Sequence, residues 1–388
     1  MTDDAERKAR IALSRVCEPG LRSVFTAVEQ RGAAEVWEAL RTGRPLRGIS
    51  RQAAEGAAGR AAGYDVDRDV RRLDQAGARL VVPGDDEWPE DRLAWAEDLR
   101  EAPPIALYVR GEPSLSEVVE KSVSMVGARA ATAYGSHVAG ELALGVADRG
   151  WAIVSGGAYG IDGAAHRGAL CSTAAATLAV LACGIDVSYP KGHDQLLGRI
   201  AAEGLLVSEH PPGCAPTRSR FLVRNRLIAA LSVGTVVVEA AVRSGSLTTA
   251  RQAAELGRVL MAVPGPVTSE MSSGAHQLMR AQNAICVCSA AHVLDAVGAI
   301  GADASDEPRA AANPRDELAE HLRRVLDAVP VRQWAGEASI ARTAGVSAAV
   351  VQQSLPPLQV AGLVEQSLQG WRLTALGAGR PAPSRAAS

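Results

Sequence analysis

The sequence predicts an α/β protein: an extended Rossmann-like parallel sheet forms its core, with a small helical domain before it and a winged-helix-like domain after it. One observation behind this prediction is the alternation of short, β-branched apolar runs with Ala-rich segments of helical length between residues 78 and 298. Apolar strands that alternate with helices are typical of a parallel sheet covered on both faces. The other is the length of 388 residues, which suits two or three domains.

The N-terminal segment 1–73 is expected to form a small helical domain. Apolar residues recur at helical spacing over 11–16 and again over 24–28, on either side of the turn Glu18-Pro19-Gly20. The pattern favours a compact domain of the SAM or helix-hairpin-helix kind. A packing or partner-binding role and contact with a DNA backbone are both open for it.

The Rossmann-like core is expected over residues 78–298. Its strands are predicted at 78–82, 105–109, 122–126, 151–154, 177–182, 204–207, 235–238, 258–263 and 284–287. From 122 onward, helices are predicted between the strands at 136–149, 160–170, 193–202, 221–231, 246–256 and 289–297. In such a sheet the carboxyl ends of the parallel strands meet at one edge, where ligands bind.

The sequence after the core indicates a linker and a further domain. Residues 299–314 are rich in Ala, Asp and Pro without periodicity, which indicates a linker. Within 315–376 we predict helices at 316–328, 338–344 and from 347, then strands at 363–366 and 371–374. This is the order of a winged helix-turn-helix. The tail 377–388 is expected to be disordered.

The third helix of this C-terminal domain shows little sign of duplex binding. It contains no Lys or Arg, so phosphate-anchored docking in a major groove is poorly supported. The pair Pro356-Pro357 is also expected to break it. We therefore favour a protein-interaction or vestigial role for the domain over readout of double-stranded DNA.

Composition and charge narrow the classes of function. The net charge of −2 gives no global basic signal, so any binding of nucleic acid has to come from a local cluster. The six Cys are scattered without a C-x-x-C pair, which indicates reduced core residues and no metal site. The N-terminus lacks an apolar signal region and no stretch approaches the ~18 apolar residues of a membrane span. We expect a cytoplasmic protein without membrane contact or cofactor.

Three predicted loops at the carboxyl edge of the sheet suit anions, because glycine lets a phosphate approach the backbone and helix N-termini favour negative charge. They are Gly127-Ala128-Arg129 after the third strand, Ser155-Gly156-Gly157 after the fourth and Arg243-Ser244-Gly245-Ser246 after the seventh. The occurrence of three such loops on one edge favours a joint binding function.

The second and third loops also have purely structural interpretations. Ser155 holds the first position of what would be a G-x-G-x-x-G fingerprint, and no G-K-[ST] P-loop occurs in the chain. A tight strand-to-helix turn explains the second loop equally well. In the third loop, Ser244 or Ser246 could simply cap the helix that follows.

The strongest local signal is the segment 217–226, which places four Arg around one of only two Phe in the chain. Arg side chains bind phosphates, and an aromatic face offers a stacking platform worth ~1–3 kcal/mol per base. A single strand offers phosphates and open base faces together, whereas a duplex hides its base faces. The alternative is a solvated helix face, with Phe221 turned into the core and the arginines paired with acidic residues.

Candidate catalytic groups are less persuasive. Asp162 and His166 are four residues apart at a helix start, but no third metal ligand lies nearby in the sequence. Glu239 and the pair Glu209-His210 lie at strand ends, where a nucleotide hydrolase would place its acid. No nucleophile, base and orienting group can be assembled from the sequence, so we expect no enzyme and no catalytic residue.

Taken together, these motifs resemble the DNA-processing protein A family, also called Smf, over nearly the whole chain. The upstream segment 85–111 is similar to that family as well. The core segments that carry the resemblance are SVSMVGAR at 122–129, SGGAYGIDGAAHRGAL at 155–170, ACGIDVSYP at 182–190, GLLVSEHPPG at 204–213, RFLVRNRLIAALS at 220–232, VVVEAAVRSGSLTTARQAAELGRVLMAVPG at 236–265 and SSGAHQLMRAQNA at 272–284.

The resemblance implies a dimeric Rossmann core that binds single-stranded DNA without catalysis and delivers it to a RecA-type recombinase, in natural transformation or repair. It further implies that Arg129 contacts a phosphate, that Arg218 is the basic residue of the pocket and that Phe221 stacks on a base. Arg224-Asn225-Arg226 would line the same pocket. Two positions depart from the family pattern: Arg218 stands where Lys is frequent, and Leu222 stands where many relatives have Pro.

Two other functions compete with this one. A nucleotide N-glycoside hydrolase of the lysine-decarboxylase-like Rossmann group would carry a P-G-G-x-G-T-x-x-E motif, but here Glu239 is followed by Arg243-Ser244-Gly245-Ser246. A transcription regulator would act through residues 315–376, and the uncharged third helix argues against it. The sequence leaves open whether the role is in transformation or repair and which surface dimerises, for which the 272–297 edge is a candidate.

Overall fold

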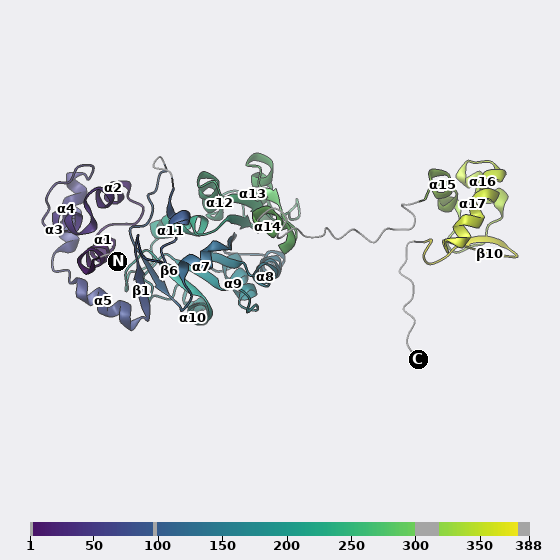
Figure 1. The fold of residues 1–388 in the computed structure, drawn as a ribbon. Coiled ribbons are helices and arrows are strands. Elements are labelled where there is room, and N and C mark those ends of the chain that lie inside the picture. Colours follow the sequence, from purple (N-terminus) through teal and green to yellow (C-terminus); the bar gives the residue numbers. More distant parts are fainter. Residues whose placement is uncertain (1–2, 96–98, 299–317, 379–388) are drawn as a thin grey trace. The chain divides into compact units, whose positions relative to one another are not determined.

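The computed structural model describes residues 3–95, 99–298 and 318–378 (Figure 1). The chain divides into two compact units, Met1–Ser305 and Asp306–Ser388. The expected linker 299–314 lies outside the described residues, as does the expected tail 377–388 apart from its first two residues.

A nine-stranded sheet forms the centre of the first unit, and it contains all nine strands expected from the sequence. In chain order they are β1 Ala78–Val81, β2 Leu107–Arg110, β3 Ser122–Val126, β4 Ala152–Gly156, β5 Thr177–Leu181, β6 Leu205–Ser208, β7 Gly234–Val237, β8 Val259–Ala262 and β9 Ile285–Cys286. Their order across the sheet is β1-β2-β6-β5-β4-β3-β7-β8-β9. From β3 onward, β4, β5 and β6 follow on one side of β3, and β7, β8 and β9 follow on its other side. β1 and β2 lie beyond β6.

The sheet is mostly parallel, as expected, but it has an antiparallel edge that the sequence pattern did not indicate. β1 pairs antiparallel with β2, and β2 pairs antiparallel with β6. A parallel neighbour requires a crossover, usually a helix of several turns. The described helices next to β2 are only α6 (Glu90–Leu93) before it and α7 (Leu115–Glu120) after it. α6, the described helix between β1 and β2, has only four residues and is not such a crossover.

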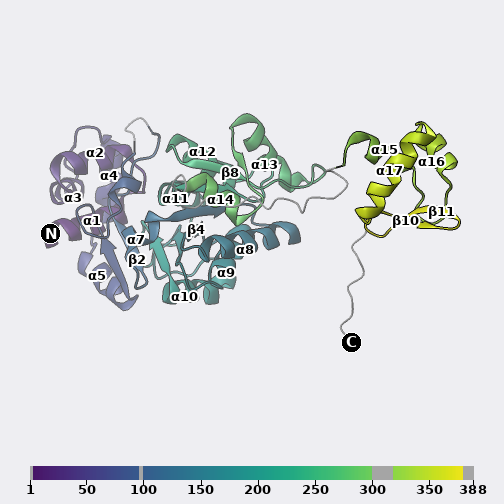
Figure 2. The same cartoon turned by 45° about the vertical axis from the view of Figure 1, so that its right-hand side comes forward.

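Helices cover both faces of the sheet, with α12 and α13 above and α8 and α9 below it in Figure 2. One face is covered by α8 (Ala133–Ala147), α9 (Ile161–Ala169) and α14 (Ala290–Val297). The other is covered by α7, α11 (Arg218–Ala230), α12 (Ser246–Glu255) and α13 (Glu270–Ala281). Met125 and Val126 of β3 enter the cores on these opposite faces, as neighbouring residues of a strand must.

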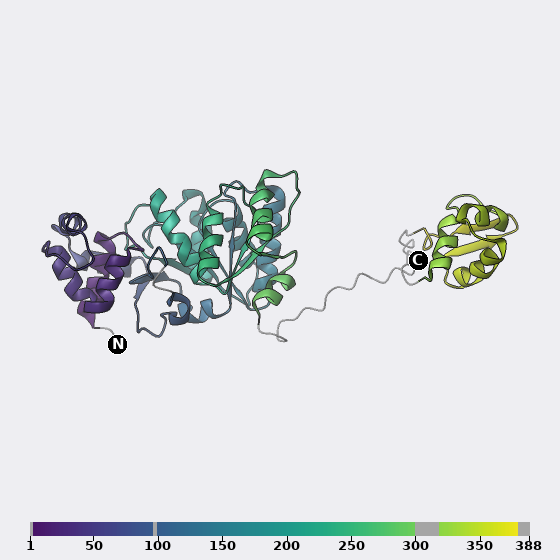
Figure 3. The same ribbon diagram turned by 90° about the horizontal axis from the view of Figure 1, so that it is seen from above.

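Five helices precede the sheet and belong to the same compact unit. They are α1 Asp4–Val16, α2 Arg22–Arg31, α3 Ala33–Arg41, α4 Arg51–Ala61 and α5 Val66–Gln75, and they lie beside one end of the sheet in Figure 3. Arginines of α1 hold the contact: Arg15 donates to the carbonyl oxygen of Pro212 at 2.6 Å, and Arg10 donates to that of Ile105 at 2.6 Å. Assignment of this segment to the SAM or helix-hairpin-helix class stays a prediction.

Residues 318–378 of the second unit form three helices and a two-stranded hairpin, in the order expected from the sequence. They are α15 Glu320–Ala328, α16 Glu337–Ala344, α17 Ala348–Val360, β10 Val364–Ser367 and β11 Gly370–Leu373. Assignment of the unit to the winged-helix class stays a prediction. In the part of the chain that the structure describes, no helix has the length and apolar character to span a bilayer.

The expectation that Pro356-Pro357 breaks the third helix of this unit is wrong, because α17 continues through both residues. Each proline removes one backbone N–H donor from the helix. Val351, Leu355 and Leu358 of the same helix are nevertheless fully buried in the core of the unit. We attribute the continuity of the helix to this packing.

Candidate functional site

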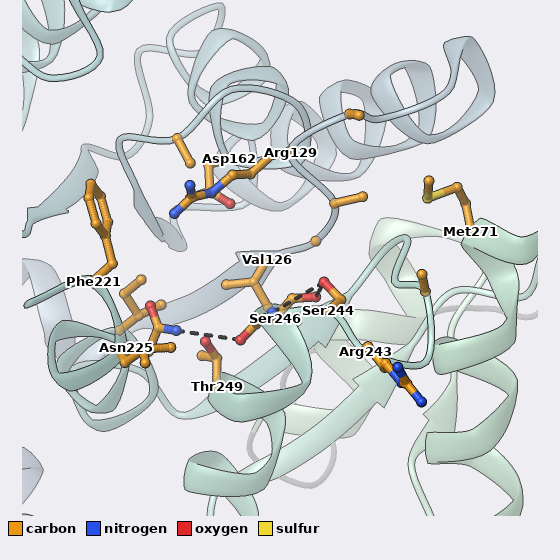
Figure 4. Close-up of a pocket in the computed structure, with 18 of the residues that line it drawn as sticks. Val126, Arg129, Asp162, Phe221, Asn225, Arg243, Ser244, Ser246, Thr249 and Met271 are labelled. Atoms are coloured by element: carbon orange, nitrogen blue, oxygen red, sulfur yellow. Dashed lines mark hydrogen bonds between the residues drawn. The ribbon is translucent and has the colours of Figure 1, made fainter. Parts of the chain in front are cut away.

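A cavity of about 640 Å³ opens at the carboxyl edge of the sheet, where the loops after β3 and β7 diverge (Figure 4). β3 and β7 are neighbours from which the chain continues in opposite directions, and such a switch point is where open α/β sheets bind ligands. Loops after β3, β4 and β7 all contribute to the lining, and α11 adds another wall. The expected site residues among the lining are Gly127, Arg129, Phe221, Arg224, Asn225, Ser244, Gly245 and Ser246.

The loops after β3 and β4 are packed tightly against each other. The N–H of Ile161 donates to the carbonyl oxygen of Ala128 at 3.2 Å. Gly160 has a φ of +78°, and a Cβ on it would overlap that same carbonyl oxygen. A Cβ on Gly127 would lie 2.5 Å from Cγ1 of Ile161. Glycine at these two positions is therefore required by the approach of the two loops, whether or not a ligand is bound.

Ser155, Gly156 and Gly157 do not line the cavity, although their loop does. Ser155 is fully buried, and its hydroxyl donates to a backbone oxygen of β3 at 2.6 Å. A Cβ on Gly156 would lie 2.6 Å from both terminal nitrogens of Arg224. The tight-turn interpretation therefore fits these three residues, while Asp162, in the first turn of α9 after the same loop, reaches the cavity.

The loop after β7 presents hydroxyl groups and a helix N-terminus to the cavity. The N-cap of α12 is Gly245, which has no side chain with which to cap the helix. The Ser244 hydroxyl lies 2.7 Å from that of Ser246 and accepts a weak 3.4 Å bond from the N–H of Ser246. The Asn225 amide donates to the carbonyl oxygen of Gly245 at 3.5 Å, which connects α11 to this loop (Figure 4). Such an arrangement suits a phosphate group.

Phe221 lies at the mouth of the cavity and not in the core. α11 begins three residues earlier than the sequence indicated, because the Thr217 hydroxyl accepts from the N–H of Arg220 at 3.4 Å and caps it. Phe221 therefore belongs to the first turn of the helix, where its ring is partly exposed. The guanidinium carbon of Arg129 lies 5.0 Å from the ring centroid, within the range of a cation–π contact.

Arg218 and Arg220, the first two arginines of segment 217–226, lie outside the cavity lining. Arg218 is exposed and forms no ion pair with another described residue. Arg220 pairs with Glu18 of the N-terminal helical segment at 2.8 Å. Arg218 is therefore a free cation beside the mouth of the cavity, whereas Arg220 connects α11 to the N-terminal helices.

Arg226 faces away from the cavity, so the expectation that it lines the same pocket as Arg224 is wrong. Two positions along a helix turn a side chain by about 200°. Arg226 forms a buried ion pair with Glu209, in which the two shortest N–O distances are 2.6 and 2.7 Å. The interpretation of the arginines as partners of acidic residues thus holds for Arg220 and Arg226.

Arg224 and Asp162 lie buried at the floor of the cavity. Arg224 donates to the carbonyl oxygen of Val180, and its guanidinium carbon lies 5.9 Å from the ring centroid of Phe221. Burial lowers the pKa of Arg224, and it raises the pKa of Asp162 to about 6 although Arg224 acts in the opposite direction. The charged groups of the lining are three guanidinium and two carboxyl groups, those of Arg129, Arg224, Arg243, Asp162 and Glu270.

The candidate catalytic groups have structural partners. Glu239 accepts from the N–H and the hydroxyl of Thr132, the N-cap of α8, at 2.9 and 2.6 Å. His166 is fully buried, with its ring nitrogens 2.8 Å from the Thr177 hydroxyl and 3.0 Å from the Gly156 carbonyl oxygen. Burial lowers the pKa of His166 to about 4. Among the described residues, no group of three or more His, Cys, Asp or Glu fits a metal ion.

Several residues at the cavity were not among the sequence candidates, and three of them carry functional groups or rings. The Tyr189 ring lies 5.5 Å from that of Phe221, and Glu270 and Met271 contribute to the lining. Tyr189 follows β5, the strand beside β4, so the rule that ligands bind beyond carboxyl ends covers its loop too. Glu270 and Met271 begin α13, and no local sequence pattern marks them.

Comparison with known proteins decides the family. Residues 79–298 match the model of the family described as DNA recombination-mediator protein A. The chain belongs to the DNA recombination-mediator protein A family. A Mycobacterium tuberculosis protein that carries the DprA name is 45% identical over 396 aligned residues, which cover 99% of each chain. Protein Smf of Escherichia coli is 39% identical over 216 aligned residues, which cover 55% of this chain and 56% of that protein.

A solved structure of the recombination-mediator family has a similar fold. DNA processing protein A from Streptococcus pneumoniae superposes with a TM-score of 0.61 at 29% identity, over 76% of this chain and 98% of that one. The family resemblance inferred from the sequence motifs is therefore confirmed. The recombination-mediator family places this chain among DNA-processing proteins.

Proposed function

We propose that this protein binds single-stranded DNA without sequence preference, protects it and loads a RecA-type recombinase on it. The observation that carries the proposal is Arg129, which forms no ion pair with another described residue, over the partly exposed ring of Phe221 and beside the N-terminus of α12. These groups bind phosphates and stack on bases, and only a single strand offers both together. The family's description as a recombination mediator supports the same role.

The character of the contacts supports binding without sequence preference. The cavity offers guanidinium groups, hydroxyl groups and backbone N–H groups, which suit the phosphate present in every nucleotide. Its aromatic rim offers a stacking surface, which every base can use. We propose that Arg129 and Arg218 contact phosphates and that Phe221 stacks on a base, while Arg226 has only a structural role.

We propose further that the protein is not an enzyme and acts in the cytoplasm. Glu239 accepts two hydrogen bonds from Thr132, the N-cap of α8, and Glu209 pairs with Arg226, so neither carboxylate at a strand end is available as a general acid. A nucleotide N-glycoside hydrolase needs such a group beside the substrate. Release of free base from nucleoside monophosphates, measured by chromatography, would contradict this proposal and support the hydrolase function.

The remaining assignments are proposals about partners and domains. We assign residues 315–376 to protein contacts and not to duplex readout, because α17 contains no Lys or Arg. We also propose a homodimer, with the 272–297 edge as the candidate surface. A sedimentation experiment on the full chain tests the dimer, and its failure would leave the DNA-binding proposal intact.

The test of the proposed function is fluorescence anisotropy of a labelled oligo-dT and a matched duplex at about 50 and 200 mM salt. Each phosphate contact on a single strand contributes about 0.7 to the logarithmic salt slope. Arg129, Arg218 and Arg243, which form no ion pair with another described residue, therefore predict a slope of about 2. That slope corresponds to a loss of roughly twentyfold between the two salt concentrations. Arg129→Glu should weaken binding strongly. Arg149→Glu, at an exposed arginine beyond the opposite edge of the sheet, is the matched control. Equal affinity for single strand and duplex would overturn the proposal.

A further inference from the structure

Among the described residues, the exposed aromatic side chains are those of Tyr134, Tyr159 and Tyr189, and the Tyr189 ring lies beside Phe221. The chain contains five Tyr, two Phe and six Trp. Tyr159 and Tyr189 are 49% and 42% exposed, whereas Tyr108 is fully buried in the core. Burial of aromatic surface stabilises a fold, so two half-exposed rings next to a binding cavity call for an explanation.

Both rings are fixed by their surroundings on one side and open on the other. The Tyr189 ring lies 5.5 Å from the Phe221 ring at an interplanar angle of 50°. The Tyr159 ring lies 4.7 Å from the His193 ring in an edge-on contact, and a Cβ on Gly192 would lie 2.5 Å from the Tyr159 hydroxyl. The lack of a side chain at Gly192 therefore makes room for the tyrosine.

The sheet brings the two tyrosines to the same edge as the cavity. Tyr159 follows β4 and Tyr189 follows β5, and these strands are parallel neighbours. Tyr159 is also next in the chain to Ala158, which lines the cavity. We call Tyr159 and Tyr189 together the tyrosine ledge.

We propose that the tyrosine ledge is a second stacking platform, over which the bases that follow the cavity-bound nucleotide leave the protein. This inference rests on the proposed function. Ring faces bind bases of any kind, and rings held in place lose little conformational freedom when they do so. Lys191 follows Tyr189 by two residues, is exposed and forms no ion pair with another described residue, so it is available for a phosphate of the same strand.

The ledge makes a prediction about strand length that the cavity alone does not make. An oligonucleotide of about three residues fills the cavity and its rim, whereas one of about twelve also reaches the ledge. Loss of the Tyr159 ring should therefore weaken binding of the longer strand by about fivefold or more and leave the shorter strand unaffected. Loss of the Tyr189 ring, which lies against Phe221, should weaken binding of the longer strand more than that of the shorter one. Loss of the Phe221 ring should weaken binding of both strands.

The experiment measures the anisotropy of oligo-dT of both lengths with wild type, Tyr159→Leu, Tyr189→Leu and Phe221→Leu. Leucine keeps apolar bulk at each position, and circular dichroism verifies that each variant folds. Tyr159→Phe is the matched control, since it removes the hydroxyl and keeps the ring, and it should bind both lengths like wild type.

The outcomes separate the ledge from the cavity. A selective loss for the longer strand in the ledge variants supports the proposal, provided that Tyr159→Phe is unaffected. Wild-type affinity of both ledge variants for both lengths, with a loss in Phe221→Leu, overturns the ledge and leaves the proposed function standing. Failure of the wild-type protein to bind either length overturns the proposed function itself.

Discussion

The guanidinium carbon of Arg129 lies 5.0 Å from the centroid of the Phe221 ring, although the two residues come from different elements, the loop after β3 and the first turn of α11. Neither residue is buried in the core. The contact places a cation and an aromatic face side by side at the mouth of one cavity. The proposed binding of single-stranded DNA depends on this pair of residues, whereas other groups near the cavity only hold the fold together.

Replacement of Phe221 by leucine should weaken single-stranded DNA binding without a large loss of stability. Base stacking on an aromatic ring contributes ~1–3 kcal/mol per base, so the dissociation constant should rise about 5-fold to 150-fold. The ring is partly exposed, so the urea concentration at the midpoint of unfolding should change little. A wild-type dissociation constant in this variant would show that the ring does not stack on a base.

Replacement of Arg226 by alanine should lower the stability of the fold and leave DNA binding unchanged. It leaves the buried carboxylate of Glu209 without its partner, which costs about 3–5 kcal/mol in comparable buried pairs. Urea unfolding should show this loss, while the folded variant binds oligo-dT as wild type does. A variant of wild-type stability with weak DNA binding would show that Arg226 belongs to the DNA-binding site.

Protonation of Asp162 should strengthen DNA binding as pH falls. Burial raises its pKa from the ordinary 3.8 to about 6 in the folded protein. Below pH 6 the carboxyl is neutral, and the cavity then holds three guanidinium groups against one carboxylate. Anisotropy at pH 5.5 should therefore give a lower dissociation constant than at pH 7.5, and Asp162→Asn should reduce the difference. Identical pH profiles of wild type and variant would contradict this account.

The same group makes a prediction about stability. A carboxyl whose folded pKa lies above its unfolded pKa binds protons more tightly in the folded state, so stability falls as pH rises from about 4 through 6. Two pKa units correspond to about 3 kcal/mol, as an order of magnitude. Urea unfolding between pH 4 and 7 should show this decrease in wild type, and it should be smaller in Asp162→Asn.

Two glycines of the cavity should respond differently to alanine. A Cβ on Gly127 would lie 2.5 Å from Cγ1 of Ile161 and 2.8 Å from the backbone oxygen of Glu239, so Gly127→Ala should lose about 1–3 kcal/mol of stability. Gly245 has no atom within 4 Å of the corresponding position. Gly245→Ala should keep wild-type stability and weaken DNA binding only, because it obstructs the approach of a phosphate to α12. Equal thermal unfolding of the two variants would contradict this distinction.

The positions of the strands were largely predictable, because buried parallel strands appear in the sequence as local runs of apolar residues. All nine strands appear close to where those runs occur, and the three loops do meet at one edge. The antiparallel pairing of β2 with β1 and β6 was not predictable, since direction depends on the path of the connections.

The roles of the individual arginines were less predictable, because their partners are distant in the sequence. Arg220 and Arg226 look equivalent to Arg218 and Arg224 in the sequence, but Glu18 and Glu209 bind them in the fold. Helical periodicity alone separates Arg224 from Arg226, once the start of α11 is known. The continuous helix through the proline pair is a similar case, in which tertiary packing overrides a local rule.

The most direct test of the central claim is photocrosslinking of a single strand that carries 5-iodouracil, followed by mass spectrometry of the linked peptides. We predict links to Phe221 or its neighbours at the cavity mouth, which disappear when unlabelled oligo-dT competes. Links confined to residues 318–378, with none in the first unit, would contradict it.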